Sequence, residues 1–237
     1  MTAGEKASEK KYLIYGGIAT GLALFVASSL QQYAMAFTTA AKAGFITTLY
    51  VILVPIVGIF LKKKVRPVIW LCAIMGVVGL YLLSMQPGTF SISHGDFFVL
   101  LCALAYTAHI LIIDYFSPKT DGVKLSCLQF VVVAICSFAA MFMTETLVMG
   151  DVVKAIIPLL YAGVLSSAVA YTLQIVAQKD ADPTVASLIL SLESVFAAIC
   201  GALLLGELLS LREVAGCVIM FIAIIVAQLP EKNNSLQ

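Results

Sequence analysis

The sequence predicts an all-α integral membrane protein built from eight transmembrane helices. Of its 237 residues, 62% are hydrophobic and 11% are charged, whereas roughly 25% are charged in an ordinary soluble domain. Long stretches without a charged residue recur along the whole chain, and the mean hydropathy is +1.06. Because these stretches lack the alternation of a membrane barrel, the backbone is expected to satisfy its hydrogen bonds by forming helices.

A helix needs roughly 20 predominantly apolar residues to cross a bilayer core. The first three spans are expected at residues 12–33, 44–61 and 68–85. Pro55 lies well inside the second span, and a kink is expected there because proline removes a backbone donor. The basic segment KKKVR at 62–66 separates this span from the third and is interpreted as a determinant of topology.

The other five spans are expected at residues 96–116, 125–146, 155–177, 184–206 and 212–229. Pro118, Pro183 and Pro230 lie at their boundaries, where a missing N–H group costs little. Within the fourth span, the stretch 97–113 is interrupted only by His109, and the stretch 183–206 around the seventh span only by Glu193. These two ionisable groups are therefore the first candidates for function.

The distribution of basic residues predicts the orientation in the membrane. Taking the N-terminus as one side, that side holds eleven of the 14 lysines and arginines, and the other side holds three. By the positive-inside rule, both termini are expected in the cytoplasm, in a multi-pass protein of the plasma or inner membrane with a cytoplasmic tail at 231–237.

An internal repeat predicts inverted topology. Shifting the chain by 143 residues places 11–61 over 154–204 without a gap, and 15 of these 51 pairs are identical, including Gln31 with Gln174. The shift carries the first span onto the sixth and the second onto the seventh. Because five helices is an odd displacement, the two copies are expected to cross the membrane in opposite senses, as in many transporters.

Three strings carry a resemblance to a known family: TTAAKAGFITTLYVILVPIVGIFL (38–61), GVVGLYLLS (76–84), and the run from DPTVASLILSLESVF to AGCVIMFIAI (182–224). They resemble the EamA-type branch of the drug/metabolite transporter superfamily. The resemblance implies an inverted-repeat bundle of five plus five helices. On that pattern, residues 1–90 form an incomplete first repeat of three spans and 91–230 a second repeat of five, with the first two of the usual ten helices apparently lacking.

Glu193 is expected near the middle of the bilayer, roughly 14 Å into its span at 1.5 Å per residue. A carboxylate at that depth must be protonated, paired or in contact with water. It is a candidate proton carrier or solute contact, and the alternative is a hydrogen-bonded group that fixes helix packing. Tyr50 is its mate in the repeat and is a candidate for the same reason.

Further solute-binding or proton-coupling candidates come from polar residues on single helix faces. Tyr106 and His109 share a face of the fourth span. On the sixth span, Tyr171 and Gln174 belong to a polar stripe that also includes Ser167 and Gln178. Gln31 is the mate of Gln174. Hydrogen bonding between helices would explain these residues nearly as well as a cavity would.

The resemblance and the polar spans together predict a secondary transporter, an exporter or exchanger of a small organic metabolite or drug-like solute. The sequence lacks a nucleotide-binding loop and metal-ligand clusters, and its six cysteines lack C-x-x-C spacing, so no ATP coupling, metal, cofactor, catalytic residue or nucleic-acid partner is expected. The alternatives are an intramembrane serine hydrolase that uses His109, or an inactive or partner-dependent partial transporter. A homodimer or partner chain is possible under this last alternative.

Overall fold

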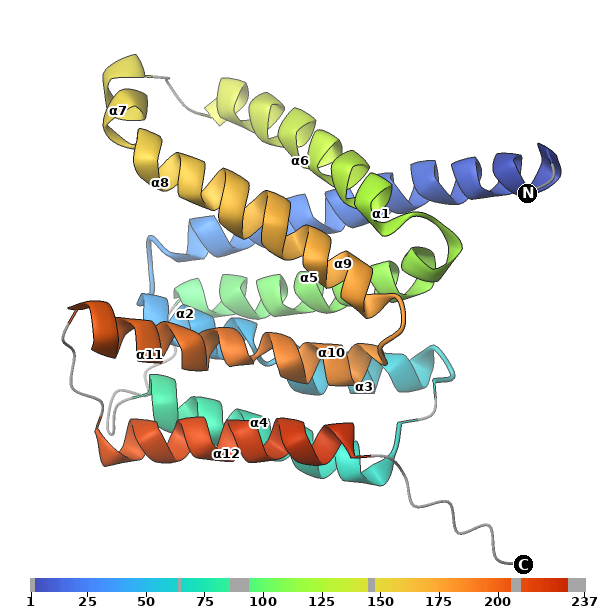
Figure 1. Ribbon diagram of the computed structural model, residues 1–237. Helices are drawn as coiled ribbons and strands as arrows, with labels where there is room; N and C mark the ends of the chain where they lie inside the picture. Colours follow the sequence, from blue (N-terminus) through green and yellow to red (C-terminus); the bar gives the residue numbers. More distant parts are fainter. Residues whose placement is uncertain (1–2, 64, 86–93, 145–147, 206–209, 230–237) are drawn as a thin grey trace, which may run out of the picture. The chain divides into compact units, whose positions relative to one another are not determined.

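The computed structural model describes residues 3–63, 65–85, 94–144, 148–205 and 210–229, and helices dominate these ranges (Figure 1). Within them, eight helices are long and apolar enough to cross a membrane: Ser8–Ala34, Lys42–Phe60, Pro67–Ser84, His94–Lys119, Gly122–Thr144, Ile156–Gln178, Pro183–Cys200 and Leu211–Gln228. The described ranges contain no β-strand. The predicted all-α membrane fold with eight spans is confirmed.

The helices pack into two compact units, each made from two separate parts of the chain. Unit 1 comprises Met1–Leu30 and Ala105–Asp182, and unit 2 comprises Gln31–Leu104 and Pro183–Gln237. Each unit therefore draws on both of the predicted sequence repeats. The predicted boundary at residue 90 separates two sequence repeats and does not coincide with the boundary between the two packing units. The two-repeat division stays a prediction.

Unit 1 contains the first part of α1 (Ala3–Ala34), the second part of α5 (His94–Phe116), η1 (Ser117–Lys119), α6 (Gly122–Thr144), α7 (Met149–Lys154), α8 (Ile156–Leu160), η2 (Tyr161–Tyr171) and α9 (Thr172–Gln178). Its apolar core consists of Ile113, Leu125 and Ile175, with Leu13 and Phe116 packed against them. The core thus joins α1, α5, α6 and α9.

Glycines allow α1 and α6 to approach closely. An added Cβ at Gly17 would lie 2.6 Å from Leu128 Cδ2, and one at Gly21 would lie 2.8 Å from the carbonyl oxygen of Gln129. Both distances are shorter than real Cβ atoms adopt. The Gly-x-x-x-Gly spacing therefore serves here as a helix-packing motif.

The sixth span is not a regular α-helix along its length. Its middle, Tyr161–Tyr171, is a π-helix of 11 residues between α8 and α9, and none of its residues is buried. Such helices are rare, and most occur as single turns at functional sites. The apolar sequence of this span does not distinguish the wider helix from an ordinary one.

Unit 2 contains α2 (Ala40–Thr47), α3 (Tyr50–Phe60), α4 (Pro67–Ser84), the first part of α5, α10 (Pro183–Leu190), α11 (Leu192–Leu205) and α12 (Leu211–Gln228). Its core is formed by Phe45, Leu80, Met85, Val195, Cys217 and Met220. Cys72, Cys102 and Cys217 are buried free thiols, as expected of packing residues.

The second and seventh spans are both interrupted by hydroxyl residues. Between α2 and α3, the Thr48 hydroxyl donates a hydrogen bond of 2.8 Å to the carbonyl of Gly44. Between α10 and α11, the Ser191 hydroxyl donates one of 2.6 Å to the carbonyl of Leu188. Such bonds to the preceding turn often bend helices. The interruption of the second span lies at Thr48, and α3 continues through Pro55, where the predicted kink stays a prediction.

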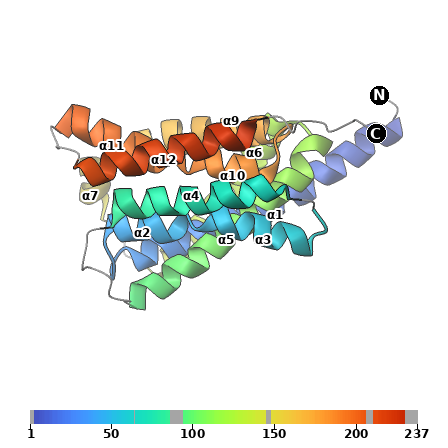
Figure 2. The same ribbon diagram turned by 90° about the horizontal axis from the view of Figure 1, so that it is seen from below.

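Helices α4 and α12 lie side by side and run in opposite directions, as both views show (Figures 1 and 2). Arg66 at the start of α4 donates hydrogen bonds of 2.6 and 2.9 Å to the carbonyls of Ala227 and Leu229 at the end of α12. At the other end, the Arg212 guanidinium lies 5.1 Å from the centroid of the Tyr81 ring. These contacts connect each end of α4 to α12.

Replacing Arg66 by alanine is expected to lower the free energy of unfolding by about 1–2 kcal/mol, because it removes two charge-assisted hydrogen bonds from the carbonyl end of α12. Reversible unfolding in mixed detergent micelles measures this change. Arg66→Lys should recover only part of the loss, since lysine lacks the fork that contacts two carbonyls. A loss no greater than that of the exposed-site control Lys179→Ala would contradict the assigned role.

Candidate functional site

The seven predicted site residues are divided between the two units. His109, Tyr106, Tyr171 and Gln174 belong to unit 1. Gln31, Tyr50 and Glu193 belong to unit 2. The structure brings a subset of the first group together around His109, and additional residues that the sequence analysis did not select join them.

His109 is almost completely buried in α5, with 1% of its surface exposed. Its Nε2 lies 2.9 Å from Oε1 of Gln129 on α6, which is itself fully buried. With the amide in this orientation, the imidazole donates from Nε2 and leaves Nδ1 as an acceptor. The ring of Tyr171 contacts the imidazole edge-on, with 6.0 Å between the centroids.

Two further polar contacts tie α9 to the same place. The side-chain amide of Gln178 donates a hydrogen bond of 2.7 Å to the carbonyl of Ile110, the residue after His109. The hydroxyls of Ser126 on α6 and Thr172 on α9 lie 2.7 Å apart and share a hydrogen bond. We call the set His109, Gln129, Gln178, Ser126 and Thr172 the polar core of unit 1.

Three side-chain atoms of the polar core are buried yet lack a hydrogen-bond partner among the residues that the structure describes. They are Nδ1 of His109, Nε2 of Gln129 and Oε1 of Gln178. Leaving such an atom unsatisfied in an apolar interior costs about 1–3 kcal/mol. The polar core therefore offers both donors and acceptors, with no carboxylate, lysine or arginine in its hydrogen bonds.

The predicted polar stripe of the sixth span lies on its less exposed side. Ser167, Tyr171 and Gln174 are half-buried and Gln178 is buried, whereas residues 168–170 between them are exposed. Tyr106 on α5 is also half-buried. The stripe predicted from the sequence therefore adjoins the polar core through Tyr171 and Gln178.

Gln129, like Ser126 and Thr172, is a member of the polar core that the sequence analysis did not select. It is the only glutamine in the predicted fifth span, and that isolation was a signal that could have selected it. The sequence did not show that its partner would be His109, twenty residues earlier on the neighbouring helix.

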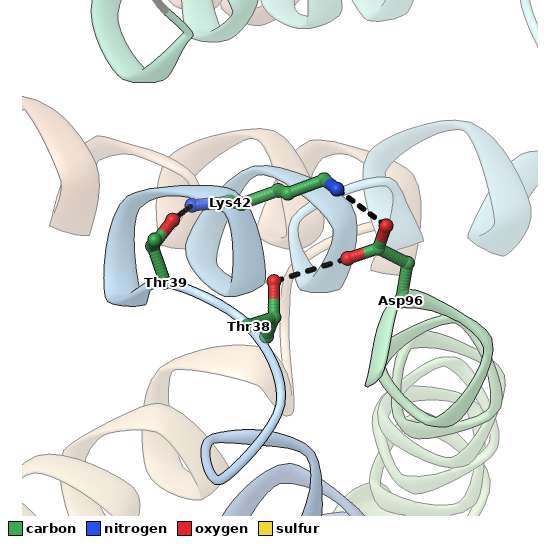
Figure 3. A network of polar contacts seen from close by, with 4 residues as sticks. All are labelled: Thr38, Thr39, Lys42 and Asp96. Carbon is green, nitrogen blue, oxygen red and sulfur yellow. Dashed lines mark hydrogen bonds and ion pairs between the residues drawn. The ribbon is translucent and has the colours of Figure 1, made fainter. Parts of the chain in front are cut away.

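Unit 2 contains an ion pair that was not predicted (Figure 3). Nζ of Lys42 on α2 lies 2.5 Å from one carboxylate oxygen of Asp96 on α5, and the Thr38 hydroxyl donates a hydrogen bond of 3.0 Å to the other. The two charged side chains are 15% and 8% exposed. The Thr39 hydroxyl caps α2 by accepting the backbone N–H of Lys42. The pair thus joins the first turns of two helices.

The remaining candidates lie in unit 2. Gln31 is half-buried near the end of α1, and Tyr50 is buried as the first residue of α3. Glu193 is exposed in the first turn of α11 and has no ion-pair partner within the described ranges. The described ranges also contain no group of three metal-ligating side chains.

Comparison with known proteins identifies the class. Residues 93–228 match the model of the EamA-like transporter family. An "Uncharacterized transporter" of Archaeoglobus fulgidus is 32% identical over 220 residues, which cover 90% of this chain and 68% of that protein. A second "Uncharacterized transporter", from Clostridium kluyveri, is 24% identical over 91% of this chain and 71% of its own length.

A solved crystal structure shares the fold, with a TM-score of 0.73 over 92% of this chain and 85% of that one, at 17% identity. The family and both relatives are described as transporters rather than as hydrolases. The resemblance noted in the sequence is thereby confirmed. The chain belongs to the EamA-like transporter family and is a multi-pass membrane transporter.

Proposed function

We propose that this chain is a secondary transporter that exports or exchanges a small organic metabolite or drug-like solute across the plasma or inner membrane, with both termini in the cytoplasm. A proton or solute gradient supplies the energy. The observation that carries this proposal is the antiparallel pairing of α4 with α12, because alternating access depends on two oppositely oriented copies.

The helix boundaries support the same repeat. Both ends of α10 (Pro183–Leu190) follow the ends of α2 (Ala40–Thr47) by 143 residues, and both ends of α12 follow those of α4 by 144. The hydroxyl residues that interrupt the two spans, Thr48 and Ser191, are also 143 residues apart. One local structure therefore occurs in both copies.

The polar core of unit 1 supplies groups that a transporter needs in an apolar environment. His109, Gln129 and Gln178 can donate and accept hydrogen bonds without carrying charge, and His109 is also a proton-coupling candidate. Glu193 is the further proton-carrying candidate, in unit 2. Polar groups within membrane spans are costly, and most of them mark solute or ion pathways.

Purified protein in proteoliposomes containing a pH-sensitive dye tests this function. A panel of amine, amide, carboxylate and alcohol metabolites is added outside, with and without an imposed pH gradient. We expect at least one compound to produce saturable flux above that of protein-free vesicles. Failure of every compound to exceed that background, in protein verified as folded, would contradict the proposal.

Glu193→Gln is expected to abolish the dependence of this flux on the pH gradient, because an amide cannot carry a proton. The matched control is Asp151→Asn, which changes an exposed carboxylate in the short helix α7 and should leave the flux unchanged. Flux and pH dependence equal to those of the wild type in Glu193→Gln would eliminate the residue as a proton carrier.

A further inference from the structure

The polar core of unit 1 contains more hydrogen-bonding capacity than its own contacts use. Gln129 accepts from His109 with its oxygen, while its NH₂ group is buried without a partner in the described ranges. Gln178 donates with its nitrogen to the carbonyl of Ile110, while its oxygen is buried without a partner there. Nδ1 of His109 is the third such atom.

The two glutamines contact neighbouring residues of α5. Gln129 reaches His109 from α6, and Gln178 reaches the adjacent residue Ile110 from α9. The ring of Tyr171 lies against His109 and against Phe130, with centroid distances of 6.0 and 5.9 Å. The imidazole of His109 therefore contacts both the Gln129 amide and an aromatic ring.

The chemistry of the three atoms selects a ligand group. The NH₂ of Gln129 requires an acceptor, and the oxygen of Gln178 requires a donor. A carboxylate can accept but not donate, and an ammonium group can donate but not accept. An uncharged group with both functions, such as an amide or a hydroxyl, can pair with either glutamine, whereas a carboxylate or an ammonium can pair with only one of them.

The absence of charged partners in the polar core favours the same kind of ligand group. None of the hydrogen bonds of the polar core involves a carboxylate, lysine or arginine. A charged solute group placed there would be desolvated without a counter-charge, which is costly within a membrane protein. A neutral group avoids this cost.

We propose that His109, Gln129 and Gln178 form a binding site for an uncharged amide or hydroxyl group of the transported solute. The inference rests on the proposed transport function for its biological role. The binding itself is a separate property and can be measured without transport.

The chain has only two histidines, His94 and His109, so ¹⁵N-histidine labelling gives a small, assignable set of NMR signals. His94→Gln identifies the signals of His109. The labelled protein in nanodiscs is titrated at neutral pH with isobutyramide, and separately with isobutyrate and isobutylamine, which are then anionic and cationic. We expect isobutyramide alone to shift the Nδ1 signal of His109 saturably.

Two variants test the contribution of the glutamines. Gln129→Met and Gln178→Met preserve side-chain length but remove the unused donor or acceptor, and each should weaken isobutyramide binding about tenfold, the equivalent of one lost hydrogen bond. Gln228→Met, at the exposed end of α12, is the control and should leave the affinity unchanged.

Three results would overturn the site: the absence of a saturable shift, equal shifts with the charged probes, or wild-type affinity in both methionine variants. If the polar core holds water alone, isobutyramide will produce no shift, so this outcome also overturns the proposal. Binding of isobutyramide without solute flux in proteoliposomes would instead refute transport and leave the site intact. Flux without this binding would refute only the site.

Discussion

Asp96→Ala is expected to lower the free energy of unfolding by about 3–5 kcal/mol, because it leaves the ammonium of Lys42 largely buried without its carboxylate. Both side chains are mostly withdrawn from solvent, at 8% and 15% exposure, and each carboxylate oxygen of Asp96 has a partner. The loss is measured as a shift in reversible unfolding in mixed detergent micelles.

The surface pair of Asp151 and Lys154 provides the matched control. Its two charges lie 3.0 Å apart at 71% and 80% exposure, so solvent screens them. Asp151→Ala should therefore change stability very little. A similar loss in both variants would show that burial does not determine the importance of the Lys42 pair.

A double substitution distinguishes the cost of an unpaired charge from the value of the pair itself. Lys42→Met combined with Asp96→Leu removes both charges and fills their space with apolar side chains. Such replacements are often neutral or stabilising, so the double variant should be clearly more stable than Asp96→Ala alone. If the double variant is as unstable as Asp96→Ala, the pair stabilises the protein through its specific contacts, which include the hydrogen bond from Thr38.

Gly79→Ala is expected to destabilise the protein by about 1–3 kcal/mol through overpacking between α4 and α12. The new Cβ would lie 2.7 Å from the carbonyl oxygen of Gly216 and 2.6 Å from Cγ of Met220. Because the carbonyl belongs to the backbone, it cannot move aside as the end of a side chain can. Unfolding in mixed micelles measures the loss.

Gly44→Ala is the control for this substitution. No atom lies within 4 Å of a Cβ added at Gly44 in α2. Alanine at an open helical position should stabilise by roughly 0.5–1 kcal/mol, because glycine loses more backbone entropy on folding. Equal behaviour of the two variants would be inconsistent with the close approach of α4 and α12.

The sequence was sufficient to predict the eight spans because crossing a bilayer requires length and apolarity, which composition reports directly. It was insufficient for the details within a span. In lipid-facing helices both sides are apolar, so the hydrophobic pattern carries little periodic information. The interruption at Thr48, the one at Ser191 and the π-helix of the sixth span were all hidden for this reason.

The candidate site was predictable where a polar residue is conspicuous in an apolar run, as with His109 and Tyr171. Its contacts were not, because Gln129 was not selected, and the contact of Gln178 from the predicted stripe with Ile110 depends on tertiary packing. The pairing of Lys42 with Asp96 was missed for a different reason. Each residue is near the end of a span, where charges are normally solvated, and only tertiary packing buries them together.

The 144-residue spacing of α4 and α12 has a consequence for the Gly79–Gly216 crossing. Exchanging the two helices maps Gly79 onto Ala223 and Gly216 onto Cys72, and both of these small residues are completely buried. The contact surface between α4 and α12 is therefore symmetric, with one pair of small residues on each side of its centre.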